Sequence, residues 1–152
     1  MERVELHKRI KTLLRRHHLL SIATVSERGP WCASCFYAWD EENNILVITT
    51  DPATRHGSEF LASPAVAGTI ALETWRVGRI RGIQFTGVVK EPQGEELTHA
   101  RKIYLRRFPY AALTDLHLWV IVPDHIKLTD NRLGFGKKII WNRQVDRPPL
   151  RG

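Results

Sequence analysis

The chain has 152 residues and a mass of 17.5 kDa, and its 43% hydrophobic and 26% charged residues are typical of one globular domain rather than a disordered or fibrous protein. No run approaches the ~18 uncharged apolar residues of a membrane span, and the first twenty residues lack a secretory signal, so we expect a cytoplasmic protein with no membrane segment. Lys and Arg outnumber Asp and Glu by 23 to 16, a net charge of +7. This surplus is typical either of a protein with an anionic partner or simply of a soluble basic protein.

The first predicted element is an amphipathic helix over Glu2–Arg16. Apolar residues recur there at helical spacing: Leu6, Ile10, Leu13 and Leu14. The basic residues between them are typical of a solvated helix face, although they could also bind phosphates. Two further helices are expected, one that follows a Thr54 cap and ends before Pro64, and one over Glu95–Arg107.

Segments rich in β-branched residues and bounded by turn residues predict about six strands. Their expected ranges are Leu19–Val25, Trp31–Trp39, Ile45–Thr50, Val66–Leu72, Arg79–Val89, and a last strand formed by His117–Val122 and Ile126–Thr129 with a bend at Pro123. Short turns join the first three, which indicates an antiparallel meander, since parallel strands need longer crossovers. Six antiparallel strands in a chain of this length favour a small closed barrel flanked by short helices.

The segment between the third strand and the second helix is the first candidate binding site. The strand brings Thr49 and Thr50 to a loop, and the helix then opens with Thr54, Arg55 and His56. Free backbone N–H groups at a helix start, a guanidinium and nearby hydroxyls together form a phosphate site. The alternative is that Thr54 only caps the helix and Arg55 is solvated.

The predicted strand Arg79–Val89 is the second candidate. Gly82 and Gln84 share one face, so a flat ligand could approach the backbone at the glycine while the amide offers a donor and an acceptor. The alternative is a strand with a bulge glycine. Cys32 and Cys35 are three apart on a strand and therefore point to opposite faces, which excludes a shared metal or a disulfide between them. We predict no metal site.

The segments TRH at 54–56, SPAVAGTIAL at 63–72, RGIQFTG at 81–87 and WVIVPDHIKLTDN at 119–131, together with the strands before them, resemble the pyridoxamine 5'-phosphate oxidase-like FMN-binding split barrels. The likeness extends over about residues 5–141, and RRFP and TDNRLGFGKKIIW are similar to a small bacterial subgroup of that superfamily. The resemblance implies a six-stranded antiparallel split β-barrel over 1–143, mainly β with some α, and a flexible tail over 144–152.

The resemblance also implies a homodimer with FMN between the subunits. It assigns the phosphate to Thr49, Thr50 and Arg55, with His56 where the family has a lysine, and it lays the flavin ring along the strand that holds Ser34, Cys35 and Phe36. Gly82 falls where the family has a glutamine, and Gln84 is a substitute on the same face. Near the C-terminus the candidates are Asn131, Lys137 and Trp141. The oxidase's substrate-binding arginine and histidine pattern is not reproduced, so we do not expect oxidation of pyridoxamine phosphate.

The leading functional prediction is an FMN-dependent oxidoreductase that acts on an unidentified small molecule, with no catalytic residue assigned. A binding module for flavin or haem without turnover, as a sensor or store, is the second. Nucleic-acid binding through the basic helices is the third, although the sequence contains no recognition motif for DNA or RNA.

Overall fold

Three α-helices and seven β-strands make up residues 4–143, the part of the chain that this computed structural model describes. The helices are α1 (Lys8–Arg16), α2 (Arg55–Ala62) and α3 (Gly94–Arg107); the strands are β1 (Leu19–Ser26), β2 (Gly29–Asp40), β3 (Ile45–Thr49), β4 (Ala65–Ala71), β5 (Arg81–Lys90), β6 (Leu118–Asp130) and β7 (Lys138–Asn142). Short 3₁₀ turns lie at Val77–Arg79, Pro109–Leu113 and Asn131–Leu133. In this part of the chain no helix combines the length and apolar content of a membrane span.

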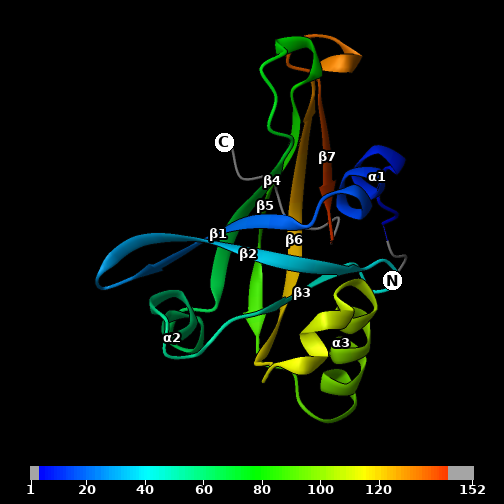
Figure 1. The fold of residues 1–152 in the computed structure, drawn as a ribbon. Helices are drawn as coiled ribbons and strands as arrows, with labels where there is room; N and C mark the ends of the chain where they lie inside the picture. The colour runs from blue at the N-terminus through cyan, green and yellow to red at the C-terminus, as the bar shows by residue number, and fades with distance from the viewer. Residues whose placement is uncertain (1–3, 144–152) are drawn as a thin grey trace.

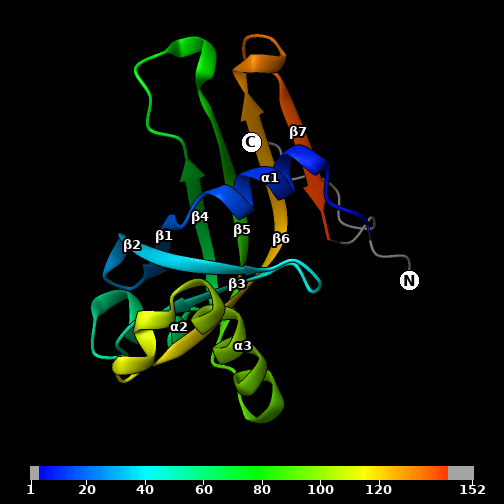
Figure 2. The ribbon, with the colours of Figure 1, turned by 45° about the vertical axis from the view of Figure 1, so that its right-hand side comes forward.

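Six of these strands close into the antiparallel barrel that the sequence predicts. Neighbouring strands pair in the order β3-β2-β1-β4-β5-β6, and pairing between β3 and β6 closes the ring. Figures 1 and 2 show the barrel from two sides. The seventh strand, β7, was not predicted: it pairs with β6 outside the ring.

The N-terminal helix is shorter than predicted. It begins at Lys8 rather than Glu2, because His7 has extended backbone and its side chain accepts a hydrogen bond from the N–H of Arg9 at 3.2 Å. Residues 1–3 of the predicted helix, and the predicted tail over 144–152, lie outside the described residues. The strand β5 likewise begins at Arg81, two residues later than predicted, because the chain forms a 3₁₀ turn over Val77–Arg79.

The barrel interior is filled by apolar side chains that alternate along each strand, and α1 and α2 complete it. The predicted stripe of α1 packs among them, and the Tyr37 hydroxyl donates to the backbone carbonyl of Leu14 at 2.9 Å. From α2, Phe60 reaches the same core, its ring 5.1 Å from that of Trp119. A second, smaller core lies outside the barrel where α3 packs over β2, β3 and β6 through Tyr104 and its neighbours.

The long strand β6 runs through Pro123, where the sequence predicts a bend, and its pairing with β5 is irregular at this point. The register with β5 shifts between Thr86 and Gly87, opposite Pro123 and the following residue. Proline cannot donate to the ladder, which explains why the pairing is interrupted there. Gly87 is required at this point, since an added Cβ would lie 2.5 Å from the carbonyl oxygen of Val122.

Candidate functional site

Helix α2 begins at the corner predicted to hold a phosphate. Thr54 caps it: its hydroxyl accepts a hydrogen bond from the N–H of Gly57 at 3.1 Å and donates to the carbonyl of Asp51 at 2.8 Å. The loop packs so closely on the helix that a Cβ at Gly57 would lie 2.4 Å from the Asp51 oxygen. The first turn of α2 is therefore fixed relative to the end of β3, and its leading N–H groups have no partner within the helix.

Arg55 is held in place from three sides. Its Nε donates to Glu59 Oε1 at 3.1 Å, its Nη2 donates to the carbonyl of Arg28 at 3.2 Å, and its guanidinium carbon lies 4.4 Å from the centre of the Trp31 ring. These bonds use two of the five N–H donors of the guanidinium and leave three. Arg55 is thus neither simply solvated nor saturated, and the remaining donors form an oriented group for an oxyanion.

The carboxylate that orients Arg55 is buried. Glu59 is 5% exposed, and it accepts further hydrogen bonds from the hydroxyls of Thr24 at 2.6 Å and Ser26 at 3.0 Å. The bond from Thr24 lowers the pKa of Glu59, burial opposes this, and the bonds from Arg55 and Ser26 lower it further. The residue is therefore ionised near neutral pH, and it offsets the charge of Arg55 while joining α2 to the β1–β2 hairpin.

Thr49, Thr50 and His56 form a second polar group at the same corner. Thr50 Oγ1 lies 2.5 Å from His56 Nε2, and Thr49 Oγ1 donates to the carbonyl of His117 at 3.1 Å. Burial lowers the pKa of His56, with Glu59 opposing, so this ring is neutral at neutral pH. The corner therefore carries hydrogen-bonding groups but not the second positive charge that a lysine would supply. His117 Nε2 is a buried nitrogen that forms no hydrogen bond in the described part of the chain, but the Glu91 carboxylate lies 3.5 Å from it.

The outer face of β1, β2, β4 and β5 is the side of these strands that points away from the barrel interior. Cross-strand register aligns Ser34, Ser21, Thr69 and Gln84 in one row. Three strand spacings separate the ends of this row, or about 14 Å. Ser34, predicted to contact the ring, and Gln84, predicted to offer an amide, therefore lie on one continuous surface. Residues that are aligned across neighbouring strands point to the same side of the sheet.

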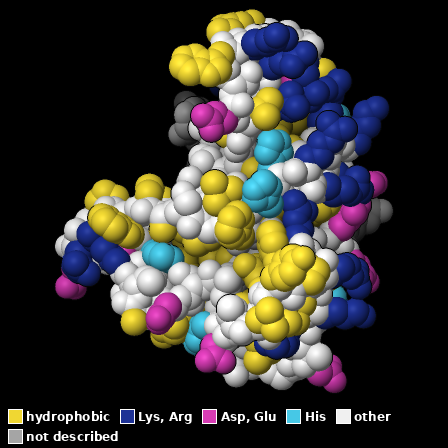
Figure 3. All heavy atoms as spheres, in the orientation of Figure 1, with side chains coloured by type: hydrophobic (Ala, Val, Ile, Leu, Met, Phe, Trp, Pro, Cys, Tyr) yellow, Lys and Arg dark blue, Asp and Glu magenta, His cyan; other side chains and the backbone are white. Residues whose placement is uncertain are grey.

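This surface, named the outer face here, is uncharged over most of its extent; Lys90, at the end of β5, points to the same side and forms an ion pair with Glu96. Its residues are small, polar or apolar: Leu19, Ser21, Ala23, Val25, Pro30, Cys32, Ser34, Phe36, Ala65, Ala67, Thr69, Ala71, Gly82, Gln84, Thr86 and Val88. Most of them are exposed. Figure 3 shows the surface over β1 and β2 largely free of charge, whereas Lys and Arg gather on the side of α1. A sheet face of this extent with so few charged side chains is unusual on a protein with a net charge of +7.

The remaining predicted residues of the ring strand divide between two environments. Phe36 lies on the outer face, 53% exposed, and its ring stacks on that of His18 with centroids 5.7 Å apart. Cys35 points inward and is buried in the core, which raises the pKa of its thiol to about 11. Cys32 is exposed on the opposite side of the strand, as predicted from the three-residue spacing.

The predicted C-terminal residues lie away from the α2 corner. Asn131 connects two turns: its Nδ2 donates to the carbonyl of Val77 at 2.9 Å and its Oδ1 accepts from Gly136 N at 3.1 Å. Lys137 is exposed in the β6–β7 turn, at the opposite end of the barrel from α2 in Figure 1. Trp141 is buried in the core, and its indole N–H donates to the carbonyl of Val4 at 2.8 Å. Within one chain these three residues therefore do not join the Arg55 group.

Sequence reasoning missed the residues that orient Arg55. The spacing of four between Arg55 and Glu59 on a helix was an available signal, because such residues are neighbours on the helix surface. Trp31 and the carbonyl of Arg28 carried no local signal, since they belong to a hairpin that approaches α2 only in the folded barrel.

Solved structures with the same fold bind different cofactors. A heme-binding protein from Mycobacterium smegmatis has a TM-score of 0.76 at 19% identity, covering 91% of this chain and 59% of that one. A pyridoxamine 5'-phosphate oxidase-related, FMN-binding protein from Nostoc punctiforme has a TM-score of 0.68 at 15% identity, covering 94% of each chain. The heme storage protein HutZ from Vibrio cholerae has a TM-score of 0.61 at 19% identity, covering 79% of this chain and 91% of that one. At these identities the comparison establishes the split-barrel fold.

Sequence relatives are closer. No family model matches the chain. The UPF0306 protein YhbP of Salmonella schwarzengrund is 45% identical over 130 residues, which cover 86% of this chain and 88% of that protein. A UPF0306 protein of Yersinia pestis is 41% identical over 134 residues, which cover 88% and 91%. With identity at this level over nearly the full length of both proteins, the chain belongs to the UPF0306 family.

Proposed function

We propose that the chain binds FMN as a homodimer, with the phosphate at Arg55 and the ring along the outer face, and that it acts as an oxidoreductase on a small molecule. The observation that carries this proposal is the orientation of Arg55. Glu59, Trp31 and the Arg28 carbonyl fix its guanidinium, and three N–H donors remain for a ligand. Ordering a guanidinium in advance reduces the entropy lost on binding, so this arrangement favours a specific anion.

The α2 corner has little net positive charge, so its affinity for a phosphate would depend on the direction of its hydrogen-bond donors. Glu59 offsets the charge of Arg55 and His56 is neutral at neutral pH. A phosphate would therefore be held by directed hydrogen bonds, from Arg55 and from the first N–H groups of the helix, whose dipole also favours an anion. The Thr50 hydroxyl, next to His56, adds a further polar group.

The outer face supports the second part of the proposal. An exposed, largely uncharged sheet of apolar and small polar side chains is suited to a flat ring and to a second copy of the chain. A two-fold contact places the same face of each chain against the other, and both faces are then free of unpaired charges. The proposed partner is therefore a second copy, with FMN in the interface between them.

FMN would supply hydride or electron transfer, and the protein would orient the ring and hold its phosphate. The FMN-binding protein from Nostoc punctiforme, which shares the fold over 94% of its length, supports this choice of cofactor. Gln84 contributes an amide to the outer face, which presents a donor and an acceptor group side by side, so we assign it to orienting the ring.

Haem binding is the second candidate, and one feature favours it. His17 and His18 line a hollow of about 290 Å³ beside the outer face, together with residues of β1 and β4. Imidazole nitrogens are common haem ligands. Two of the structures with this fold are haem proteins by their description. The absorption spectrum separates the two candidates, since bound flavin and bound haem absorb at different wavelengths.

The deciding experiment compares FMN with riboflavin, which lacks the phosphate, by fluorescence titration of the cofactor-free protein. Arg55→Ala is expected to weaken FMN binding by roughly ten- to a hundredfold, because bonds to a charged group contribute about 1.5–3 kcal/mol. Its riboflavin affinity should stay unchanged. The matched control is Arg101→Ala on the exposed side of α3, which removes the same charge. Equal FMN affinity in wild type and Arg55→Ala, or a haem spectrum in the purified protein, would overturn the FMN assignment.

A further inference from the structure

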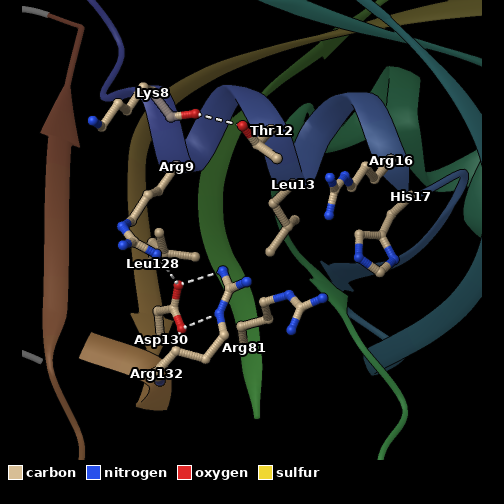
Figure 4. A pocket seen from close by; sticks show the side chains of 10 residues that line it. All are labelled: Lys8, Arg9, Thr12, Leu13, Arg16, His17, Arg81, Leu128, Asp130 and Arg132. Atoms are coloured by element: carbon tan, nitrogen blue, oxygen red, sulfur yellow. Dashed lines mark hydrogen bonds and ion pairs between the residues drawn. The ribbon is translucent and has the colours of Figure 1, made fainter. Parts of the chain in front are cut away.

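A basic pocket lies between α1 and the barrel, away from the Arg55 corner. Its volume is about 270 Å³. Figure 4 shows Arg9, Arg16 and His17 projecting from α1 toward β5 and β6, where Arg81 and Arg132 project from the other wall. The full lining, named the arginine pocket here, is Lys8, Arg9, Thr12, Leu13, Arg16, His17, Arg81, Leu128, Asp130 and Arg132.

The arginine pocket contains one carboxylate, that of Asp130, and two arginines form ion pairs with this carboxylate. Asp130 is fully buried, and Arg132 donates to both of its oxygens, from Nε at 2.9 Å and from Nη2 at 2.7 Å. Arg9 Nη1 donates to the same group at 3.2 Å. The bond from Arg132 is the main reason that the pKa of Asp130 falls to about 2. The carboxylate therefore stays ionised and is already committed to these two partners.

Three further cationic side chains line the pocket without an ion-pair partner in the described part of the chain. Lys8, Arg16 and Arg81 form no ion pair within residues 4–143. Burial, and after it the charge of Arg132, lower the pKa of the Arg81 guanidinium, with Asp130 opposing. Arg81 is directly opposite Asp130 in the β5–β6 register, yet the carboxylate binds Arg132 and Arg9 instead.

The pKa of His17 reflects the positive electrostatic potential in this pocket. Its pKa is lowered first by burial and then by Arg81, His18, Arg107 and Arg16. All four of these neighbours are basic, so the space beside the imidazole is one in which positive charge is unfavourable. The same space is favourable for an anion.

A solvated helix face does not account for this arrangement. Arg15, on the outer side of α1, forms an ion pair with Glu41, as expected of a surface residue. Arg81 is on a strand, is half-buried and faces a second wall of cations. The guanidinium groups that converge on this concave site outnumber its one carboxylate, so they repel one another, and a bound oxyanion would reduce that repulsion.

We propose that the arginine pocket binds a small molecule that carries a phosphate or diphosphate group. The guanidinium groups of Arg16 and Arg81 match the oxygens of such a group by paired hydrogen bonds, and Lys8 adds a point charge. The volume lies near the lower limit for small-molecule pockets, which suits a compact anion better than a large cofactor.

The position of the pocket suggests where the rest of the ligand lies. His17 lines both the arginine pocket and the hollow beside the outer face. A ligand anchored by its phosphate could therefore extend toward β1 and β4, which makes it a candidate substrate. This last step rests on the proposed flavin site; the anion site itself does not.

The test uses inorganic pyrophosphate as the probe and calorimetry on flavin-free full-length protein at moderate salt. We expect pyrophosphate binding in the wild type that persists in Arg55→Ala, and a loss of affinity of roughly tenfold or more in Arg16→Gln/Arg81→Gln, because two charge-assisted contacts are removed. The matched control, Arg101→Gln/Lys102→Gln on α3, removes the same two charges from an exposed surface. Thermal unfolding of each variant checks that the fold is retained.

Three outcomes would overturn the inference: no pyrophosphate binding to the wild type, equal affinity in Arg16→Gln/Arg81→Gln, or an equal loss in the α3 control. A fourth is tight binding of short duplex DNA that both double variants weaken alike, which would indicate a surface for nucleic acid instead. FMN affinity is measured in parallel on all variants. If Arg16→Gln/Arg81→Gln loses pyrophosphate and keeps FMN, the two sites are separate; a protein that binds pyrophosphate but no flavin contradicts only the proposed function.

Discussion

Glu59 fixes the direction of Arg55 from one turn further along α2. The carboxylate is buried and the guanidinium is half-buried, with Nε 3.1 Å from Oε1. Ion pairs at this spacing on exposed helices contribute little, but here Thr24 and Ser26 hold the carboxylate from the neighbouring strand. Arg55, the proposed hydrogen-bond donor to the phosphate, is therefore positioned by the β1–β2 hairpin as much as by its own helix.

Thr24→Val tests this support without touching Arg55. The change keeps the side-chain shape and removes the hydroxyl that donates to Glu59 at 2.6 Å. We expect a lower melting temperature, because a buried carboxylate loses a hydrogen bond, and weaker FMN binding, because Arg55 is less well ordered. Differential scanning calorimetry and the FMN titration measure the two effects. Thr98→Val, on the exposed side of α3, is the control; an unchanged melting temperature in Thr24→Val would mean that the network does not support the corner.

Acid should destabilise the protein through Asp130. Its pKa is about 2 in the folded chain, below its ordinary value of 3.8, so its stabilising effect is complete above about pH 4 and is lost as the pH falls toward 2. The difference corresponds to about 2 kcal/mol in the free energy of unfolding. Urea unfolding at a series of acidic pH values measures it. Arg132→Gln removes the main cause of the shift and should flatten this pH dependence, whereas Arg101→Gln should not.

The strands, the outer face and the α2 corner could be predicted because each depends on local sequence. Alternation along β5 placed Gln84 outward and Phe85 inward, and Thr54 with Pro64 bounded a short helix. The arginine pocket could not be predicted in this way. Arg81 and Asp130 are 49 residues apart in the sequence, and only the antiparallel register of β5 and β6 brings them opposite each other.

The C-terminal candidates illustrate a second limit. Trp141 follows a glycine-rich, basic turn, and the family resemblance makes it a candidate for the flavin site. In the fold its segment instead adds strand β7 to β6, and the indole joins the core beneath α1. A short apolar run after a flexible turn does not reveal whether it will cover a ligand or extend a sheet, because that depends on the free edge of a strand elsewhere in the chain.

The proposed dimer can be tested at the centre of the outer face. Ala67 is exposed there, between Ala23 and Thr86 in the cross-strand register. Ala67→Asp introduces a charge that would be buried without a partner in the dimer but solvated in the monomer. Sedimentation equilibrium should give twice the 17.5 kDa chain mass for the wild type and the single-chain mass for this variant. Ala112→Asp, on an exposed 3₁₀ turn, should stay dimeric; a monomeric wild type would contradict the proposed assembly.

The reactivity of the two cysteines provides an independent test of how exposed the outer face is. Cys35 is buried and its pKa is raised to about 11, whereas Cys32 is exposed on the outer face, opposite Ala23. A thiol reagent at mildly alkaline pH should therefore label one thiol per chain in the native protein and both in denaturant. Cys32→Ser should abolish the native labelling and Cys35→Ser should keep it. Two rapidly labelled thiols in the native wild type would contradict the burial of Cys35.

Because a second copy would cover Cys32, labelling should also be faster in monomeric Ala67→Asp than in the wild type, and equal rates would argue that the outer face is open to solvent in both.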